Sequence, residues 1–294
     1  MDSIREKTFK VFTIAVLAAI VILAFPAPVS ADVGPKASLK INCTNLPEGE
    51  VYLDLLINEP PFENEGGFRF SQYEWGDDPE SYNADMLAIL KEYNKDGWRP
   101  ALVTGTSLPL WGELRLNTEN GKATATFSYM GVPSRFKIIA VAENGEVSVS
   151  NIIERKNFES TVDFDFAARS AAERSFVTLT VKQFAFTLIA TLIIEGLILL
   201  AFRFSLRQNW KPFLFVNLST QIALHAGVAF TYTFLGTAFA LIAFVLLEIL
   251  ILIIEVVLYM FLLKQHSKVR RALYALAANF ASAVCGIVIM LLLL

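Results

Sequence analysis

Four long apolar stretches in the C-terminal part constrain this chain more than any other feature of its 294 residues. They cover residues 181–204, 213–235, 238–263 and 272–294. Each contains the about 20 residues that a helix needs to cross the hydrocarbon core of a bilayer. The preceding part has the alternating pattern of strands. We therefore expect an α+β membrane protein, with an extracytoplasmic antiparallel β-sandwich-like domain followed by a four-helix transmembrane bundle.

The charges between the apolar stretches predict the orientation. Basic residues gather after the first and third stretches, at Arg203, Arg207, Lys211, Lys264, Lys268, Arg270 and Arg271. Lysine and arginine concentrate in cytoplasmic loops, so loops 204–212 and 264–271 are expected inside. Residues 32–180 are then outside, and the protein is a multi-pass protein of the cell membrane.

The N-terminus has the layout of an export signal over residues 1–31. Three basic residues precede an apolar run at 11–25, and Val29-Ser30-Ala31 offers the small residues of a cleavage site. We expect cleavage after Ala31. An uncleaved anchor helix is the alternative, although the run is short for a full span. Either way, the chain from Asp32 onward is delivered outside.

Residues 32–175 are expected to form the β-rich domain. Leu39, Ile41 and Cys43 alternate with polar residues, and residues 51–57 form the next strand. Asn-Gly pairs at 120–121 and 144–145 stand between strand-like runs and predict two hairpins. A helix capped by Ser81 or Asn83 interrupts the strands.

Charge and cysteine content exclude two classes of protein. Residues 32–180 carry 23 acidic and 14 basic side chains, which would repel nucleic acid. The two cysteines, Cys43 and Cys285, fall in different predicted domains, so we expect no disulfide framework.

An irregular acidic and aromatic loop follows the second strand, over residues 59–85. Its candidate ligand residues are Glu63, Glu65, Trp75, Asp77, Asp78 and Glu80. Carboxylates could hold a hard cation such as calcium, although no D-x-D-x-D-G spacing is present. A solvated loop pinned by aromatic side chains and a protein or peptide contact are the other two interpretations.

Polar residues inside the apolar stretches form the second candidate site. All three acids after residue 181 lie there, and the full cluster is Glu195, Asn217, Thr220, Gln221, His225, Glu248, Glu255 and Tyr259. A charged group at the bilayer centre costs at least about 2.5–3.5 kcal/mol, so these glutamates should face the bundle interior and meet the polar stripe of the second helix. Replacing Glu248 by leucine should then destabilise the bundle, because its hydrogen-bond partners would be left unsatisfied.

Three interpretations of this cluster stay open. It is a structural hydrogen-bond network, a path or site for a proton, cation or small polar substrate, or a metal-dependent enzyme site that uses His225. The sequence has no H-E-x-x-H motif and no E-x-x-H pair in these stretches, which counts against the enzyme.

The same residues carry a resemblance to a known pattern. Asn217, Thr220 and Gln221 form N-x-x-T-Q, and Glu248, Glu255 and Tyr259 form E-x6-E-x3-Y. This arrangement resembles uncharacterised bacterial polytopic membrane proteins, and residues 127–138 look similar to the exported part of that group. The resemblance implies a bacterial cell-membrane location and implies no activity.

We predict a non-enzymatic protein, with no catalytic residues and no cofactor, whose exported domain binds or senses a ligand. A small transporter or proton- or cation-coupled protein is the first alternative, and an intramembrane metal-dependent enzyme with an unknown metal is the second. The expected partners are the lipid bilayer and an extracytoplasmic protein or small molecule. Small residues along the fourth helix could also form a homo-oligomer face, with Ala275, Ala278, Ser282 and Gly286.

Overall fold

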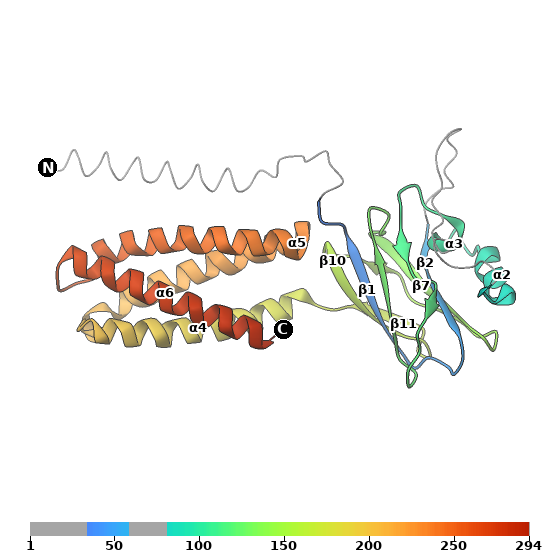
Figure 1. Cartoon of the computed structure of the whole chain (residues 1–294), viewed down its shortest axis with the longest axis horizontal. Coiled ribbons are helices and arrows are strands. Elements are labelled where there is room, and N and C mark those ends of the chain that lie inside the picture. Colours follow the sequence, from blue (N-terminus) through green and yellow to red (C-terminus); the bar gives the residue numbers. More distant parts are fainter. Residues whose placement is uncertain (1–33, 59–80, 294) are drawn as a thin grey trace. The chain divides into compact units, whose positions relative to one another are not determined.

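The protein is described from a computed structural model that defines residues 34–58 and 81–293, without the side chains of residues 179 and 285–293. The predicted signal at 1–31 and the predicted loop residues Glu63, Glu65, Trp75, Asp77, Asp78 and Glu80 lie outside the described residues. Residues from Lys36 onward form one compact unit, which contains two β-sheets and three long helices (Figure 1).

The β-part contains two sheets. The first has the strand order β11-β10-β1-β6-β4. Its strands are β1 (Ser38–Thr44), β4 (Trp111–Gly112), β6 (Ala123–Ser128), β10 (Glu159–Asp165) and β11 (Ser170–Glu173). The second has the order β3-β2-β7-β8, with β5 beside β2 and β9 beside β7. Its strands are β2 (Val51–Ile57), β3 (Arg99–Pro100), β5 (Arg115–Leu116), β7 (Arg135–Ala142), β8 (Val147–Val149) and β9 (Ile153–Glu154).

The two sheets share one hydrophobic core. Leu39, Ile41 and Cys43 of β1 are buried as predicted, and they belong to the same cluster as the apolar side chains of β2 and β7. All seven residues of β2 are buried, because the helices α2 (Ala84–Glu92) and α3 (Ala101–Thr104) pack against this second sheet as well. The α+β class is therefore confirmed.

One strand pair departs from the predicted antiparallel sandwich. Strand β10 runs parallel to β1, with Ser38 opposite Glu159 and Thr44 opposite Asp165. All strands of the second sheet come between β1 and β10 in the sequence. The chain therefore returns to the first sheet at β10 after a long connection. Alternation within a strand reports which face is buried and carries no information on such a distant partner.

The two Asn-Gly turns form, but only one closes a regular hairpin. Gly145 lies in the turn that joins β7 to β8, which pair antiparallel as predicted. Asn120 and Gly121 both have positive φ, as a type I′ turn requires. The residues that flank this turn, Glu119 and Lys122, form an isolated antiparallel bridge that does not extend into a strand pair. Strand β5 before this turn pairs with β2 instead of β6, so the turn connects one sheet to the other.

Helix α2 begins as the sequence indicates. The side chain of Asn83 accepts hydrogen bonds from the backbone N–H groups of Asp85 and Met86, so Asn83 is the N-cap and Ser81 is not. Met86 and Leu90 of the predicted apolar stripe are buried in the domain core.

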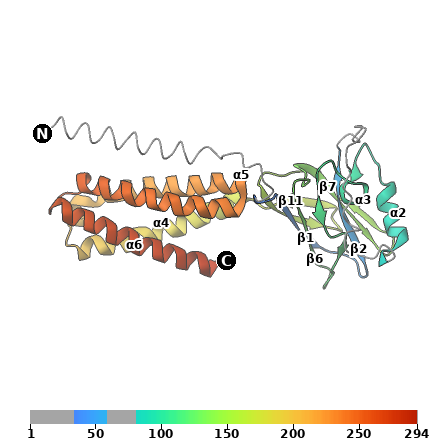
Figure 2. The ribbon, with the colours of Figure 1, turned by 45° about the horizontal axis from the view of Figure 1, so that its top comes forward.

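The C-terminal part contains α4 (Phe176–Ala201), α5 (Leu206–Leu262) and α6 (Lys268–Leu293). Helix α5 is interrupted at Gly236, whose φ of 82° and ψ of −178° are not helical. Hydrogen bonds join Asn217 to Tyr259 and Thr220 to Glu255, so the two arms on either side of Gly236 lie antiparallel. Four helical segments therefore result, which lie side by side in both views (Figures 1 and 2).

Two of the described helices, α4 and α5, are long and apolar enough to cross a membrane. Their boundaries differ slightly from the predicted stretches, because α4 begins at Phe176 and the first arm of α5 begins at Leu206. Polar residues at both helix ends continue the helix beyond the apolar run, which hydropathy alone does not detect.

The separate core of the β-part leads to a first prediction. Its hydrophobic cluster ends at Ala171, and a second cluster in the helices begins at Leu199. A fragment of residues 36–174 is therefore expected to fold alone as a soluble β-rich monomer, with a cooperative thermal transition. Far-ultraviolet circular dichroism and size-exclusion chromatography test this. A helix-dominated spectrum or persistent aggregation would contradict it.

Candidate functional site: a polar cavity among the helices

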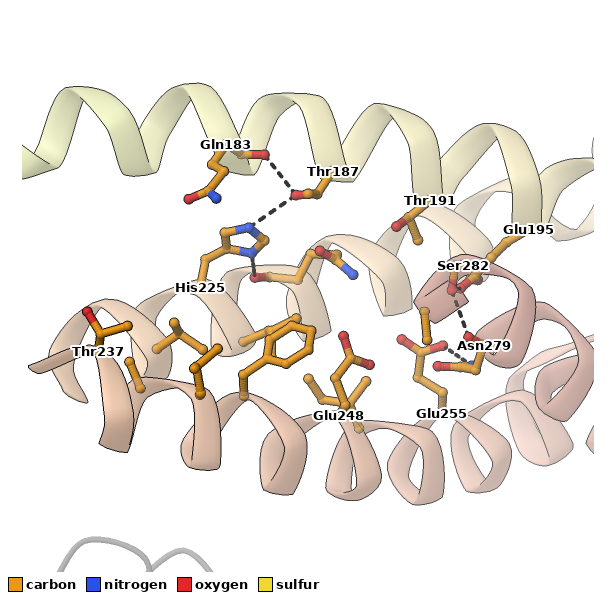
Figure 3. A pocket seen from close by; sticks show the side chains of 18 residues that line it. Gln183, Thr187, Thr191, Glu195, His225, Thr237, Glu248, Glu255, Asn279 and Ser282 are labelled. Atoms are coloured by element: carbon orange, nitrogen blue, oxygen red, sulfur yellow. Dashed lines mark hydrogen bonds between the residues drawn. The ribbon is translucent and has the colours of Figure 1, made fainter. Parts of the chain in front are cut away.

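Helix α4 presents one polar stripe on an otherwise apolar surface. Gln183, Thr187, Thr191 and Glu195 follow one another at intervals of four residues. This spacing places all four on nearly the same face of a helix. All four side chains line a cavity among the helices (Figure 3).

The two arms of α5 and helix α6 supply the remaining walls. Gln221, His225, Thr237, Glu248 and Glu255 come from α5, while Asn279 and Ser282 come from α6. Leucine, isoleucine, valine, alanine and phenylalanine side chains fill the spaces between them. The cavity volume is about 170 Å³, which is room for several water molecules or a small organic ligand.

Glu255 is the most completely bonded of the three glutamates. Its Oε1 accepts a hydrogen bond of 2.6 Å from the hydroxyl of Thr220, and its Oε2 accepts one of 2.8 Å from the Asn279 side chain. The carboxyl group is 2% exposed. It therefore joins both arms of α5 to α6.

Glu195 is also buried, but only one of its oxygens has a partner. Oε1 accepts a hydrogen bond of 3.1 Å from Ser282 of α6, while Oε2 has none and is shielded from solvent. Glu195 thus bonds to the last apolar stretch, and Asn217 of the second stretch lies beside the same carboxyl group, as predicted. An unpartnered buried oxygen costs free energy, which a donor in the cavity would recover.

Glu248 lies between His225 and Glu255 along the cavity (Figure 3). Within the described part of the chain, its carboxyl has no hydrogen-bond partner. The expectation that Glu248 meets the polar stripe of the second apolar stretch is therefore not fulfilled. The reason is geometric: the polar residues of that stretch bond to Glu255, Tyr259 and α4, at other depths.

His225 connects α5 to α4. One ring nitrogen, Nε2, lies 3.1 Å from the hydroxyl of Thr187, and the other, Nδ1, lies 3.0 Å from the backbone oxygen of Gln221. The side-chain oxygen of Gln221 is buried without a partner. This oxygen and Oε2 of Glu195 are two acceptors at the cavity wall that receive no hydrogen bond within the described part of the chain.

Asn217 and Tyr259, the last two predicted residues, lie beyond the cavity. The Asn217 side chain donates a hydrogen bond of 2.8 Å to the hydroxyl of Tyr259. Tyr259 belongs to a buried cluster with Phe204, Phe213 and Tyr274, one or more turns past Glu195 and Glu255. This aromatic cluster fills the bundle toward loops 203–205 and 263–267, so the cavity is blind at that end.

The opposite end of the cavity is more open. Gln183 and Thr237 are exposed, whereas Thr191, Glu195 and Glu255 are buried. At this end the carboxylate of Glu159, the first residue of β10, accepts hydrogen bonds from the backbone N–H and the hydroxyl of Thr237. Access to the glutamates is therefore from the end at the α5 turn.

The polar side chains that line the cavity suit an ammonium group or a proton better than a metal ion. No three side chains of His, Cys, Asp or Glu are grouped as metal ligands in residues 34–58 and 81–293, as far as they are described. Glu248 lies apart from Glu195 and Glu255 along the cavity, whereas metal ligands must converge on one point. Spread carboxylates provide separate positions for cationic groups.

Part of this cavity was not predicted from the sequence. Gln183, Thr187, Thr191 and Asn279 are not among the predicted site residues, and Ser282 was predicted only on a helix face of small residues. A periodic signal was present, because Q-x3-T-x3-T-x3-E marks one polar line within an apolar helix.

No family model, no curated protein and no solved structure matches this chain. The resemblance noted from the N-x-x-T-Q and E-x6-E-x3-Y patterns therefore stays a prediction.

Proposed function

We propose that the chain is a multi-pass, non-enzymatic membrane protein whose four helical segments bind a small organic cation. The observation that carries this proposal is the cavity, in which Glu248 and one oxygen of Glu195 have no hydrogen-bond partner among the described residues. A carboxyl group without a partner in a low-dielectric site is expensive unless a cation or proton joins it.

A membrane location is supported by the outer faces of the helices. Large apolar side chains are more than half exposed there, including Phe186, Ile193, Phe230 and Phe280. An exposed apolar surface of this extent is costly in water and is suited to lipid. Hydrogen bonds between loops 203–205 and 264–271, such as Ser205 to Gln265, hold the basic residues at one end of the bundle.

The charge distribution supports an orientation for this site. Basic loops favour the cytoplasm, so the end that contains the aromatic cluster is proposed to be inside. The mouth at Gln183 and Thr237 then opens toward the side of the acidic β-domain. A cavity that the described aromatic cluster closes at the basic end favours binding or sensing of an external ligand over a continuous pore. The exported domain would act together with the bundle in this role.

Butylammonium binding tests the proposal. The purified full chain in detergent micelles is expected to bind this ion saturably in isothermal titration calorimetry. Glu248→Gln should weaken binding at least tenfold, because the charge opposite the ammonium group is lost. Its thermal unfolding should remain unchanged, since Glu248 has no hydrogen bond to lose.

The matched control makes the same chemical change on the surface of the β-domain. Glu92 is exposed on α2, and Glu92→Gln should leave butylammonium affinity unchanged. The proposal is wrong if the wild-type chain shows no saturable binding, or if Glu248→Gln binds as tightly as the wild type.

A further inference from the structure

Two carboxyl groups in the cavity have oxygens free to accept hydrogen bonds from a ligand. Glu248 has no partner in the described chain, and Oε2 of Glu195 is buried and unpartnered. Glu195 itself is 1% exposed. Glu255 is better satisfied, because each of its oxygens already accepts a hydrogen bond, from Thr220 and from Asn279.

These two free carboxyl groups lie at different depths. Ser282 bonds to Glu195 on the same face of α6 from which Asn279 bonds to Glu255, so Glu195 and Glu255 lie at a similar level. Glu248 precedes Glu255 by seven residues on one helix face. At 1.5 Å per residue, the two free carboxyl groups are separated by about 10 Å along the helix axes.

The wall between the two levels is largely apolar, with Thr191 of α4 as a polar residue in it. Ile251 lies between Glu248 and Glu255 on the same helix face, and Leu224 lies opposite on the other arm of α5. They are 6% and 4% exposed, respectively. Along the helix axes, Glu248 thus marks one polar level and Glu195 a second, with the apolar side chains of Ile251 and Leu224 between them.

We propose that the ligand class of this cavity is a linear alkyl diamine, with one ammonium group at Glu248 and the other at Glu195. This inference rests on the proposed function and specifies its ligand. The methylene chain would lie against Leu224 and Ile251, where contact with apolar side chains is favourable.

The inner ammonium group also accounts for the unpartnered acceptors. An ammonium group has three N–H donors and no acceptor. Oε2 of Glu195 and the side-chain oxygen of Gln221 are both buried, both unpartnered and both on residues that line the cavity. One ammonium group could donate to both, whereas the neutral end of a monoamine could not.

Comparison of matched ligands tests the inference on the full chain in detergent micelles. The probes are 1,4-diaminobutane, butylamine and 1,4-butanediol, titrated at the same pH and salt concentration. We expect 1,4-diaminobutane to bind at least tenfold more tightly than butylamine, and the uncharged diol not to bind. A short diamine, 1,2-diaminoethane, cannot span the two carboxyl groups and should bind no better than butylamine.

Glu195→Gln gives the matched variant. The amide oxygen can still accept from Ser282, but the negative charge at the inner end is lost, so the ratio of the two affinities should fall to about one. The wild-type comparison alone decides the matter if this variant does not fold. Equal affinities for 1,4-diaminobutane and butylamine would overturn the diamine assignment and leave the proposed function standing. Absence of binding by every amine would overturn both.

Discussion

Replacement of Glu255 by leucine is expected to lower the free energy of unfolding of the helical part by about 1–3 kcal/mol. The change removes the acceptor of Thr220 and of Asn279, and both donors are buried. These are the hydrogen bonds that connect the two arms of α5 to α6. Thermal unfolding of the full chain in micelles, followed by circular dichroism at 222 nm, measures the effect.

Glu255→Gln should be less damaging. The amide oxygen can accept from Asn279, and the amide nitrogen can donate to the hydroxyl of Thr220, whose proton can go to the backbone oxygen of Val216. We expect less than half the loss seen for leucine, since both connections can be retained.

Glu248→Leu is the control from the same helix face. In the described chain this carboxyl has no hydrogen-bond partner, so leucine should be neutral or stabilising there, contrary to the expectation from the sequence. If leucine at position 248 destabilises the bundle as much as leucine at position 255, the division between a structural and a free glutamate is wrong.

This contrast shows how far the helical part could be predicted. The apolar stretches locate the helical segments, since they are long, continuous and closed by basic loops. The high cost of a carboxyl group in lipid then predicts that Glu195, Glu248 and Glu255 face inward. All three line the cavity.

The partners of these glutamates could not be predicted in the same way. Asn279 and Ser282 lie in a helix rich in small residues, which is also the pattern of close helix packing. Only the rotation of α6 about its own axis decides whether they reach Glu255 and Glu195. Rotation depends on the packing of all four segments, which periodicity within one segment does not report.

The β-part shows the same division between local and distant information. The strand β2 follows from neighbouring residues and was predicted with its boundaries, and Asn83 is one of the two caps predicted for α2. The parallel pairing of β10 with β1 joins residues more than a hundred positions apart. Asp54 is a further example, because an acid in an apolar strand indicates an outward position, yet Asp54 is fully buried.

Asp54 is buried because its carboxyl group binds the start of α3. It accepts hydrogen bonds from the backbone N–H groups of Leu102, Val103 and Leu55, over 2.6–3.1 Å. Alanine at position 54 would leave these buried donors without a partner, each at a cost of about 1–3 kcal/mol. We therefore expect Asp54→Ala to lower the unfolding free energy of the 36–174 fragment by more than about 3 kcal/mol in chemical denaturation.

The same burial predicts how stability depends on pH. Burial raises the pKa of Asp54 to about 7 in the folded domain, from an ordinary value of 3.8. Between these pH values the folded state retains a proton that the unfolded chain has released, so the contribution of Asp54 to stability is fully present below pH 4 and is lost as pH rises toward 7. The full effect is on the order of 4 kcal/mol, and stability should level off above pH 7.

Denaturation of the fragment at pH 4.5, 6 and 8 measures this fall, and Asp54→Asn is the control because asparagine does not titrate. Asp163 changes stability in the opposite direction, since the hydrogen bond from Arg174 lowers the pKa of its carboxyl. That contribution is lost only as pH falls below the ordinary pKa of an aspartate, so it does not overlap the range above pH 4.5. Stability that stays flat or rises from pH 4.5 to 8 would show that the three N–H groups outweigh burial and keep Asp54 ionised.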